Sequence, residues 1–293
     1  MDQGTQDQGP GTKGAAPLAA YQGAPGAYSE TAAWALLGAD APLLPCVTLR
    51  DVFDAVASGR ASRAVVPVEN TLAGAVPDAA ELIVAHAVTV TAETIVQIEH
   101  VLAGPPGLRL ADVRRVLSHP VALAQCTRFF HAHPAIAAVP VFDTAGAVPL
   151  ALAADDHATA AIASRRAAAL HGAQILAEHF QDHAENWTRF LLVTPAANRV
   201  APPAWPHKAM IACRLRHEPG ALARALAPVA ARGLNLTRIE SRPIHGRPFE
   251  YQFLLELQAD RAGQNLQPAI DDLAREASWL HVLGIFTPAP RLS

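Results

Sequence analysis

Short apolar runs alternate with Ala- and Leu-rich segments of helical length along most of the chain, beginning at Leu18. This alternation is typical of strands and crossover helices in a mostly parallel α/β sheet. The pattern predicts strands at residues 18–22, 64–69, 115–117, 138–142, 159–163, 175–179 and 189–194. Residues 1–16 are rich in Gly and Gln and have little to bury, so we expect a flexible tail there.

Three helix starts carry their own signals. Ser29 is a candidate N-cap for the segment before Trp34, and Pro77 and Pro120 suit the first positions of helices at 79–85 and 121–130. Each of these helices follows closely after a strand or an apolar run. In open α/β sheets such junctions line the ligand crevice, because strand ends meet helix N-termini there.

A proline-rich stretch divides the chain into two domains. Pro202, Pro203 and Pro206 interrupt both helix and strand, which predicts a linker at 196–206 between an N-terminal domain, 17–195, and a C-terminal domain, 207–293. Beyond the linker the pattern predicts strand 209–216, helix 221–232, strands 234–241 and 251–257, helix 266–276 and strand 280–286. That order is βαββαβ, the ferredoxin-like plan.

Composition narrows the function. The 293 residues are 51% hydrophobic and 17% charged with a formal net charge of −3, so neither nucleic acid nor an acidic membrane is an expected partner. Three distant cysteines without CxxC spacing favour a reducing compartment, and the histidines form no recognisable ligand motif, so we expect no metal. We see no signal pattern and no apolar run of membrane-spanning length, which favours a cytoplasmic protein.

Polar residues gather where the predicted strands of the N-terminal domain end. They comprise Gln22 to Ser29, Glu69 with Asn70 and Thr71, Ser118 with His119, Asp143 with Thr144, and Ser164. Taken singly, each group has a simple structural explanation, because Ser, Thr, Asn and Asp commonly cap helices and form turns. Their combination favours a binding site instead.

Four segments in order give a resemblance to a known family. They are Ala20-Tyr21-Gln22-Gly23-Ala24-Pro25-Gly26-Ala27-Tyr28-Ser29-Glu30, Val66-Pro67-Val68-Glu69-Asn70-Thr71-Leu72-Ala73-Gly74, Leu117-Ser118-His119-Pro120 followed by Ala122-Leu123-Ala124-Gln125-Cys126, and Asn186-Trp187-Thr188-Arg189-Phe190-Leu191. With these segments the chain resembles the prephenate dehydratases over nearly its whole ordered length. Three departures are Thr71 in place of the more frequent Ser, Val121 in place of Gln, and Trp187 in place of a smaller aliphatic residue.

The C-terminal domain is similar to an ACT domain, a small regulatory fold that often binds amino acids. The segments Pro219-Gly220-Ala221-Leu222 and Glu240-Ser241-Arg242-Pro243 carry this resemblance, with Gly233-Leu234-Asn235-Leu236-Thr237 leading into the second. The resemblance implies that L-phenylalanine binds there as an allosteric effector. The implied effector-binding residues are Gly220, Ala221, Leu222, Asn235, Leu236, Glu240, Ser241, Arg242 and Pro243.

For the N-terminal domain the resemblance implies a two-lobed α/β fold like that of periplasmic binding proteins. It also implies conversion of prephenate to phenylpyruvate, carbon dioxide and water, without a cofactor. The implied substrate-binding residues are Tyr28, Ser29, Asn70, Thr71, Ser118, Thr144, Ser164, Arg189 and Phe190. The implied catalytic residues are Thr188, Glu69 and His119.

The chemistry of these side chains sets what each can do. A threonine hydroxyl is a weak acid, so we expect Thr188 to be a positioned hydrogen-bond donor, with Glu69 or His119 as the source of the proton. Successive residues of a strand point to opposite faces, so Arg189 either grips a substrate carboxylate or forms a structural ion pair. We expect Phe190 to pack in the core and orient its neighbours.

Two other functions stay open at this point. An arogenate dehydratase, which forms phenylalanine directly, shares the Gly23 to Glu30 segment and the Asp143-Thr144-Ala145-Gly146 segment. A non-catalytic amino-acid sensor or solute-binding module would also use a two-lobed cleft, although the polar set around Thr188 argues against it. The resemblance further implies assembly as a homodimer or homotetramer.

Overall fold

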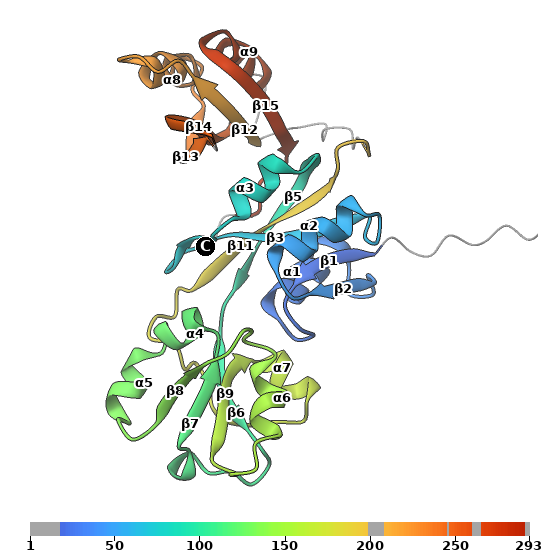
Figure 1. Cartoon of the computed structure of the whole chain (residues 1–293), viewed down its shortest axis with the longest axis vertical. Coiled ribbons are helices and arrows are strands. Elements are labelled where there is room, and N and C mark those ends of the chain that lie inside the picture. The colour runs from blue at the N-terminus through green and yellow to red at the C-terminus, as the bar shows by residue number, and fades with distance from the viewer. Residues whose placement is uncertain (1–17, 199–207, 245, 260–264, 291–293) are drawn as a thin grey trace, which may run out of the picture.

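The computed structural model describes residues 18–198, 208–244, 246–259 and 265–290. In Figure 1 two α/β lobes and a C-terminal domain follow one another along the long axis, with the first lobe in the middle. The predicted tail at 1–16 and most of the predicted linker at 196–206 lie outside the described residues.

The first lobe is built on a mixed sheet of order β2-β1-β3-β11-β5, with β4 beside β3. Its strands are β1 (Ala19–Gln22), β2 (Leu43–Cys46), β3 (Arg63–Asn70), β4 (Gly74–Ala75), β5 (Val88–Gln97) and β11 (Trp187–Pro195). Its helices are α1 (Tyr28–Leu37), α2 (Leu49–Ala57) and α3 (Ala79–Ala85). Strand β1 pairs parallel with β2 and β3, whereas β11 lies antiparallel between β3 and β5.

The second lobe contains a sheet of order β10-β6-β9-β7-β8. Its elements are β6 (His100–Gly104), the short 3₁₀ helix η1 (Leu110–Asp112), β7 (Arg115–Ser118), α4 (Pro120–Ala124), α5 (Thr127–Ala132), β8 (Ala137–Pro140), α6 (Ala147–Leu152), β9 (Thr159–Ser164), α7 (Arg165–Leu170) and β10 (Gln174–Ala177). The chain crosses between the lobes twice, from β5 to β6 and from β10 back to β11. Two crossings confirm the two-lobed α/β architecture.

The C-terminal domain is a four-stranded antiparallel sheet with two helices on one face, in the predicted βαββαβ order. Its elements are β12 (Lys208–Leu215), α8 (Ala221–Ala231), β13 (Asn235–Ile244), β14 (Arg247–Gln258), α9 (Leu266–Glu276) and β15 (Ala277–Phe286). Val229 from α8 and Leu273 from α9 pack with Leu255 of the sheet to form the core of this domain.

The other face of the C-terminal sheet packs on the first lobe. Leu191 of β11 and Val90 of β5 share one apolar core with Met210 and Leu254 of the C-terminal domain. Strand β15 approaches β5 so closely that a Cβ atom added at Gly284 would lie 2.1 Å from the Val90 carbonyl oxygen. The absence of a side chain at Gly284 is what permits this contact.

The sheets differ from the prediction in direction and in number of strands. A mostly parallel sheet was expected, but both strands that follow the crossings run antiparallel to their neighbours, because each returns from the other lobe. Strands β2, β5 and β6 were not predicted. In β5 and β6 the buried polar side chains Glu93 and His100 interrupt the apolar pattern.

Two helix predictions also need correction. Helix α1 begins at Tyr28, so Ser29 lies inside its first turn and the capping position falls on Ala27. The helix expected at 121–130 is broken at Gln125 and Cys126 into α4 and α5. Pro120 does occupy the first turn of α4, as predicted, with the His119 side chain capping it.

Candidate active site

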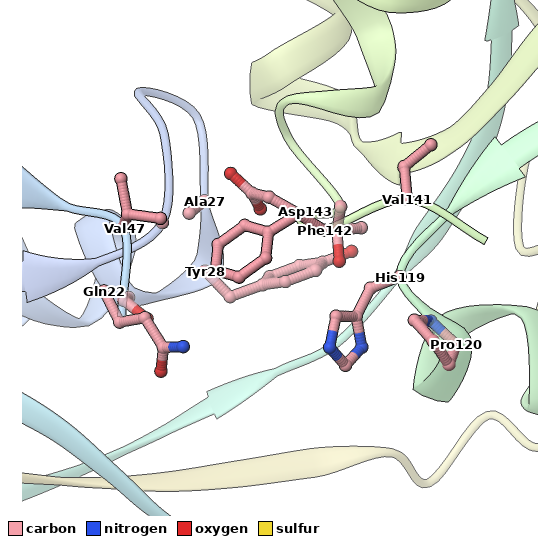
Figure 2. A pocket seen from close by; sticks show the side chains of 12 residues that line it. Gln22, Ala27, Tyr28, Val47, His119, Pro120, Val141, Phe142 and Asp143 are labelled. Atoms are coloured by element: carbon pink, nitrogen blue, oxygen red, sulfur yellow. The ribbon is translucent and has the colours of Figure 1, made fainter. Parts of the chain in front are cut away.

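A cavity of about 800 Å³ lies between the two lobes, and a second of about 390 Å³ adjoins it. Both are lined by side chains from each lobe, including Tyr28, Ser29, His119 and Thr144. Figure 2 shows the smaller cavity, with Gln22 and Val47 reaching it from the first lobe and His119, Phe142 and Asp143 from the second.

Strand β11 carries Thr188 and Phe190 into the larger cavity. Thr188 lies opposite Asn70 of β3 in the sheet register, and both side chains are buried. Asn70 Nδ2 donates a hydrogen bond of 2.9 Å to Thr188 Oγ1. Because Oγ1 receives this hydrogen, the hydroxyl hydrogen of Thr188 is available for a group in the cavity. It has no acceptor among the described residues.

A chain of buried side chains continues from Asn70 across the junction of the lobes. Asn70 Nδ2 also lies 2.7 Å from Asn186 Oδ1, and Asn186 Nδ2 donates to Gln125 Oε1 at 2.9 Å. His100 Nε2 lies 3.0 Å from the same Gln125 oxygen. Asn186 and His100 are almost fully buried, so each of these donors depends on its partner in the chain.

The far end of this chain reaches the first helix. The Tyr28 hydroxyl has one hydrogen and two acceptors within reach, the Glu99 carbonyl at 2.6 Å and His100 Nδ1 at 3.1 Å. Burial lowers the pKa of His100 and raises that of Tyr28. Both side chains are therefore neutral near neutral pH, as a buried hydrogen-bonded chain requires.

His119 projects into both cavities from the start of α4. Its Nδ1 accepts the Val121 backbone N–H at 3.2 Å, which leaves the ring hydrogen of the neutral form on Nε2. Burial lowers the pKa of His119, and the nearby Asp143 carboxylate acts in the opposite direction. In its neutral form His119 is thus a hydrogen-bond donor through Nε2.

The cavities also offer groups that bind anions. The larger one is lined by the first turn of α2, including Arg50, and by Ser29 in the first turn of α1. First-turn N–H groups have no partner inside a helix and carry the positive end of its dipole. In the part of the chain that the structure describes, no group of three or more His, Cys, Asp and Glu side chains is arranged to hold a metal ion.

Two of the predicted site residues lie on the other side of the sheet. Arg189 points away from the cavity and forms ion pairs with Glu69 at 3.2 Å, Glu93 at 3.0 Å and Glu256 at 2.8 Å. Of the two expectations for Arg189, the structural ion pair is the one observed. Glu69, expected to handle a proton beside the substrate, does not line either cavity, because its position in β3 turns it toward Arg189.

Three further predicted residues stabilise the lobes without lining either cavity. Ser118 Oγ is fully buried and donates to the Ile162 carbonyl at 2.7 Å. Thr71 Oγ1 donates to the Glu185 carbonyl and accepts the Trp187 N–H, which fixes the start of β11. Ser164 caps α7 and donates to the Gly26 carbonyl at 2.6 Å, joining the two lobes.

The predicted effector-binding residues fall in two places. Ala221 and Leu222 line a cavity of about 180 Å³ at the start of α8, where Gly220 adopts φ 78°. The others belong to β13, namely Asn235, Leu236, Glu240, Ser241, Arg242 and Pro243. Glu240 there accepts hydrogen bonds from Arg238 and Arg242, so its carboxylate is already partnered.

Sequence reasoning missed His100, Gln125, Asn186 and Arg50 as site residues. Gln125 and Asn186 lie in segments that carried the resemblance, and their amide side chains were the available signal. His100 gave no local signal, because its role depends on the crossing from β5 to β6. Arg50 lies in the first turn of α2 after a strand that was not predicted.

Fold and site together define a class: two-lobed α/β proteins with a cavity between the lobes and an attached ferredoxin-like domain. The prephenate dehydratase family model matches residues 19–198, and the ACT domain model matches 209–275. Since the first model covers more than half of the chain, the protein belongs to the prephenate dehydratase family, and its C-terminal domain is an ACT domain.

Individual relatives agree with this assignment. The chain is 36% identical to arogenate dehydratase/prephenate dehydratase 2 of Arabidopsis thaliana, over 91% of this chain and 72% of that one. It is 34% identical to a bifunctional N-acyl-homoserine lactone acylase/prephenate dehydratase of Komagataeibacter europaeus, over 93% and 96%. The structure of an Arthrobacter aurescens prephenate dehydratase in complex with L-Phe is similar, with TM-score 0.83, 31% identity and coverage of 92% and 89%.

Gln125→Leu tests the buried chain of side chains. The substitution leaves His100 Nε2–H and Asn186 Nδ2–H without an acceptor, and each such group costs about 1–3 kcal/mol. We expect the free energy of unfolding, measured with urea, to fall by about 2 kcal/mol or more. Gln97→Leu, which removes a single hydrogen bond of 3.3 Å from an exposed glutamine, is the control. Equal effects of the two substitutions would show that these buried hydrogen bonds contribute little to the free energy of unfolding.

Proposed function

We propose that this protein catalyses the decarboxylating dehydration of prephenate to phenylpyruvate. The observation that supports it most is the hydrogen bond from Asn70 to Thr188, which leaves the Thr188 hydroxyl hydrogen available to a group in the cavity between the lobes. The family to which the chain belongs is named for this reaction, which supports the same conclusion.

The reaction needs little beyond hydrogen bonding and charge. The ring carboxylate leaves as carbon dioxide, and its bonding electrons enter the ring. The ring hydroxyl leaves with one added proton as water, and the product ring is aromatic. Prephenate dianion plus one proton thus gives phenylpyruvate anion, carbon dioxide and water. The protein has to hold two carboxylates and assist the departing hydroxyl.

Thr188 assists the departing hydroxyl as a hydrogen-bond donor, because Asn70 donates to its oxygen and leaves its own hydrogen for the substrate. His119 supplies the proton from Nε2 as the imidazolium ion; Nδ1 also carries a hydrogen in that state, so the contact with the Val121 N–H is given up. A bound dianion favours the protonated form of His119, which offsets the effect of burial on its pKa. General acid catalysis of this kind contributes about 10²–10⁴-fold.

The substrate carboxylates bind at the positive end of the cavity. Arg50 and the first-turn N–H groups of α2 lie on one wall, and those of α1 at Tyr28 and Ser29 lie on another. These groups place charge complementary to a dianion along the walls of the cavity. Phe190 and the ring of Tyr28 form apolar walls against the substrate ring.

Arogenate is a second candidate substrate, favoured by one observation. The Asp143 carboxylate lines the smaller cavity, where it would attract the ammonium group that distinguishes arogenate from prephenate. Its two oxygens already accept the N–H groups of Ala24 at 2.7 Å and Ala145 at 3.0 Å, so its charge is partly satisfied.

Turnover of purified protein on both substrates decides between them. We expect a higher kcat/KM for prephenate, measured by the formation of phenylpyruvate. A higher kcat/KM for arogenate would assign the second function. A folded protein inactive on both would indicate a sensor without catalytic activity.

Thr188→Ala tests the catalytic assignment. Removal of the hydroxyl should lower kcat by about 10²-fold or more and leave KM and the thermal unfolding temperature nearly unchanged, because the side chain is small and acts in the transition state. Thr188→Ser keeps the hydroxyl and is the matched control, expected to retain most of the activity. Wild-type kcat in Thr188→Ala would remove Thr188 from the mechanism.

The ACT domain is proposed to bind L-phenylalanine as a feedback inhibitor. The cavity of about 180 Å³ beside α8 supports this, because Leu222 and Tyr251 offer apolar contacts while Arg214 and Glu250 offer charges for the carboxylate and ammonium groups. Calorimetry should show binding, and Leu222→Asp should weaken it about tenfold, the effect of losing one apolar contact. Absence of binding to the wild-type chain would refute the effector site.

We also propose a cytoplasmic homodimer or homotetramer. Among the described residues no helix is long and apolar enough to cross a membrane. Exposed apolar side chains on the ACT sheet, including Ile239 and Tyr251, support contact with a second copy.

A further inference from the structure

The residue next to Thr188 connects the catalytic strand to the ACT domain. Arg189 donates from Nη1 to Glu256 Oε2 at 2.8 Å and from Nη2 to Glu256 Oε1 at 2.8 Å. Glu256 belongs to β14 of the ACT sheet, and its side chain is 1% exposed. A two-point contact between a guanidinium and a carboxylate fixes both the distance and the relative orientation of the two groups.

Two more buried charges belong to this cluster. Lys208 Nζ of β12 lies 2.9 Å from Glu256 and 3.1 Å from Glu93 of β5, and Arg189 also pairs with Glu93. Arg189 and Glu93 of the catalytic lobe therefore face Lys208 and Glu256 of the ACT domain, and Arg238 of β13 adds a third cation 3.6 Å from Glu256. Burial by itself raises the pKa of Glu256, but Arg189 and Lys208 outweigh it and hold the pKa below its usual range.

The same cluster reaches the partner of Thr188 as well. Arg189 Nη2 pairs with Glu69 at 3.2 Å, and Glu69 precedes Asn70, the residue that orients the Thr188 hydroxyl. In the sheet register Thr188 faces Asn70 and Arg189 faces Glu69. Thr188 and Asn70 are thus each adjacent in sequence to a residue, Arg189 or Glu69, that forms an ion pair on the ACT side of the sheet.

Close packing surrounds the cluster. Leu191 and Val193 of β11 share a core with Met210 and Leu254 of the ACT sheet, and β15 touches β5 at Gly284. A close-packed boundary transmits a shift of one sheet to the other instead of absorbing it. Separation of the buried charges is strongly unfavourable, so Arg189 follows Glu256 when the ACT sheet moves.

We propose that Glu256 is a positioning residue for the dehydration: through Arg189 it fixes strand β11 and the Thr188 hydroxyl, and phenylalanine bound to the ACT domain inhibits by shifting this ion pair. The proposal rests on the proposed function. It deepens that function by naming the contact through which the ACT domain acts on the cavity.

Glu256→Gln in the full chain tests the proposal, because the amide keeps the shape and removes the charge that holds Arg189. Misplacement of a catalytic group by about 1 Å costs up to about 10²-fold, so we expect kcat to fall at least about tenfold while KM for prephenate changes less than about twofold. Phenylalanine should still bind by calorimetry, but the ratio of activity without and with saturating phenylalanine should fall toward one.

Asp272→Asn is the matched control. Among the described residues, Asp272 of α9 forms ion pairs with Arg232 and Arg275, both within the ACT domain, so kcat and inhibition by phenylalanine should both stay at the wild-type level. If Glu256→Gln does not fold, Arg189→Lys replaces it, because lysine keeps the charge but cannot make the two-point contact. The same fall in kcat and loss of inhibition are expected.

The outcomes separate this proposal from the proposed function. A wild-type chain inactive on prephenate and arogenate overturns the proposed function itself. An active wild type, together with a folded Glu256→Gln or Arg189→Lys variant of unchanged kcat, overturns the positioning role. A raised KM with unchanged kcat does the same. A lowered kcat together with full inhibition by phenylalanine in either variant overturns the proposal that phenylalanine inhibits by shifting this ion pair.

Discussion

Successive side chains of strand β11 point to opposite faces of the sheet, and the rest of the structure depends on this alternation. Thr188 and Phe190 face the cavity between the lobes, whereas Arg189 faces the ACT domain. One strand therefore connects the proposed site of the reaction with the ACT domain at adjacent residues. Because β11 lies between β3 and β5, it is held on both edges, and its side chains have little freedom to move.

Buried polar contacts hold each of these faces in place by different means. On the cavity side, neutral amides, an imidazole and a hydroxyl form a chain from Thr188 to Tyr28 that spans both lobes. On the ACT side, charged groups of opposite sign balance one another. Neither arrangement adds much net stability over apolar packing, but each penalises alternative geometries heavily, since a displaced buried polar group loses its partner.

The sequence predicted the parts of the structure that local patterns determine. The βαββαβ order of the C-terminal domain, the helix start at Pro120 and the polar set around Thr188 all follow from short segments. The strands that follow the crossings were missed or assigned the wrong direction, because their neighbours come from distant parts of the chain. The alternation of Thr188 and Arg189 was predictable from the strand alone. The face that each occupies was not predictable, because it depends on which distant elements pack against each side of the sheet. The resemblance implied that Glu69 lies beside the substrate, but because it is adjacent to Asn70 in the strand it points to the opposite face.

The central claim is that the substrate reacts in the interlobe cavity beside Thr188 and His119. A crystal structure of the protein with the product phenylpyruvate bound tests it most directly. We predict that the product ring lies between the lobes, with the Thr188 hydroxyl and His119 Nε2 at the ring position from which water departs and the carboxylate near the first turns of α1 or α2. Product ordered at another site, with this cavity filled only by solvent, would show that the reaction does not take place beside Thr188 and His119.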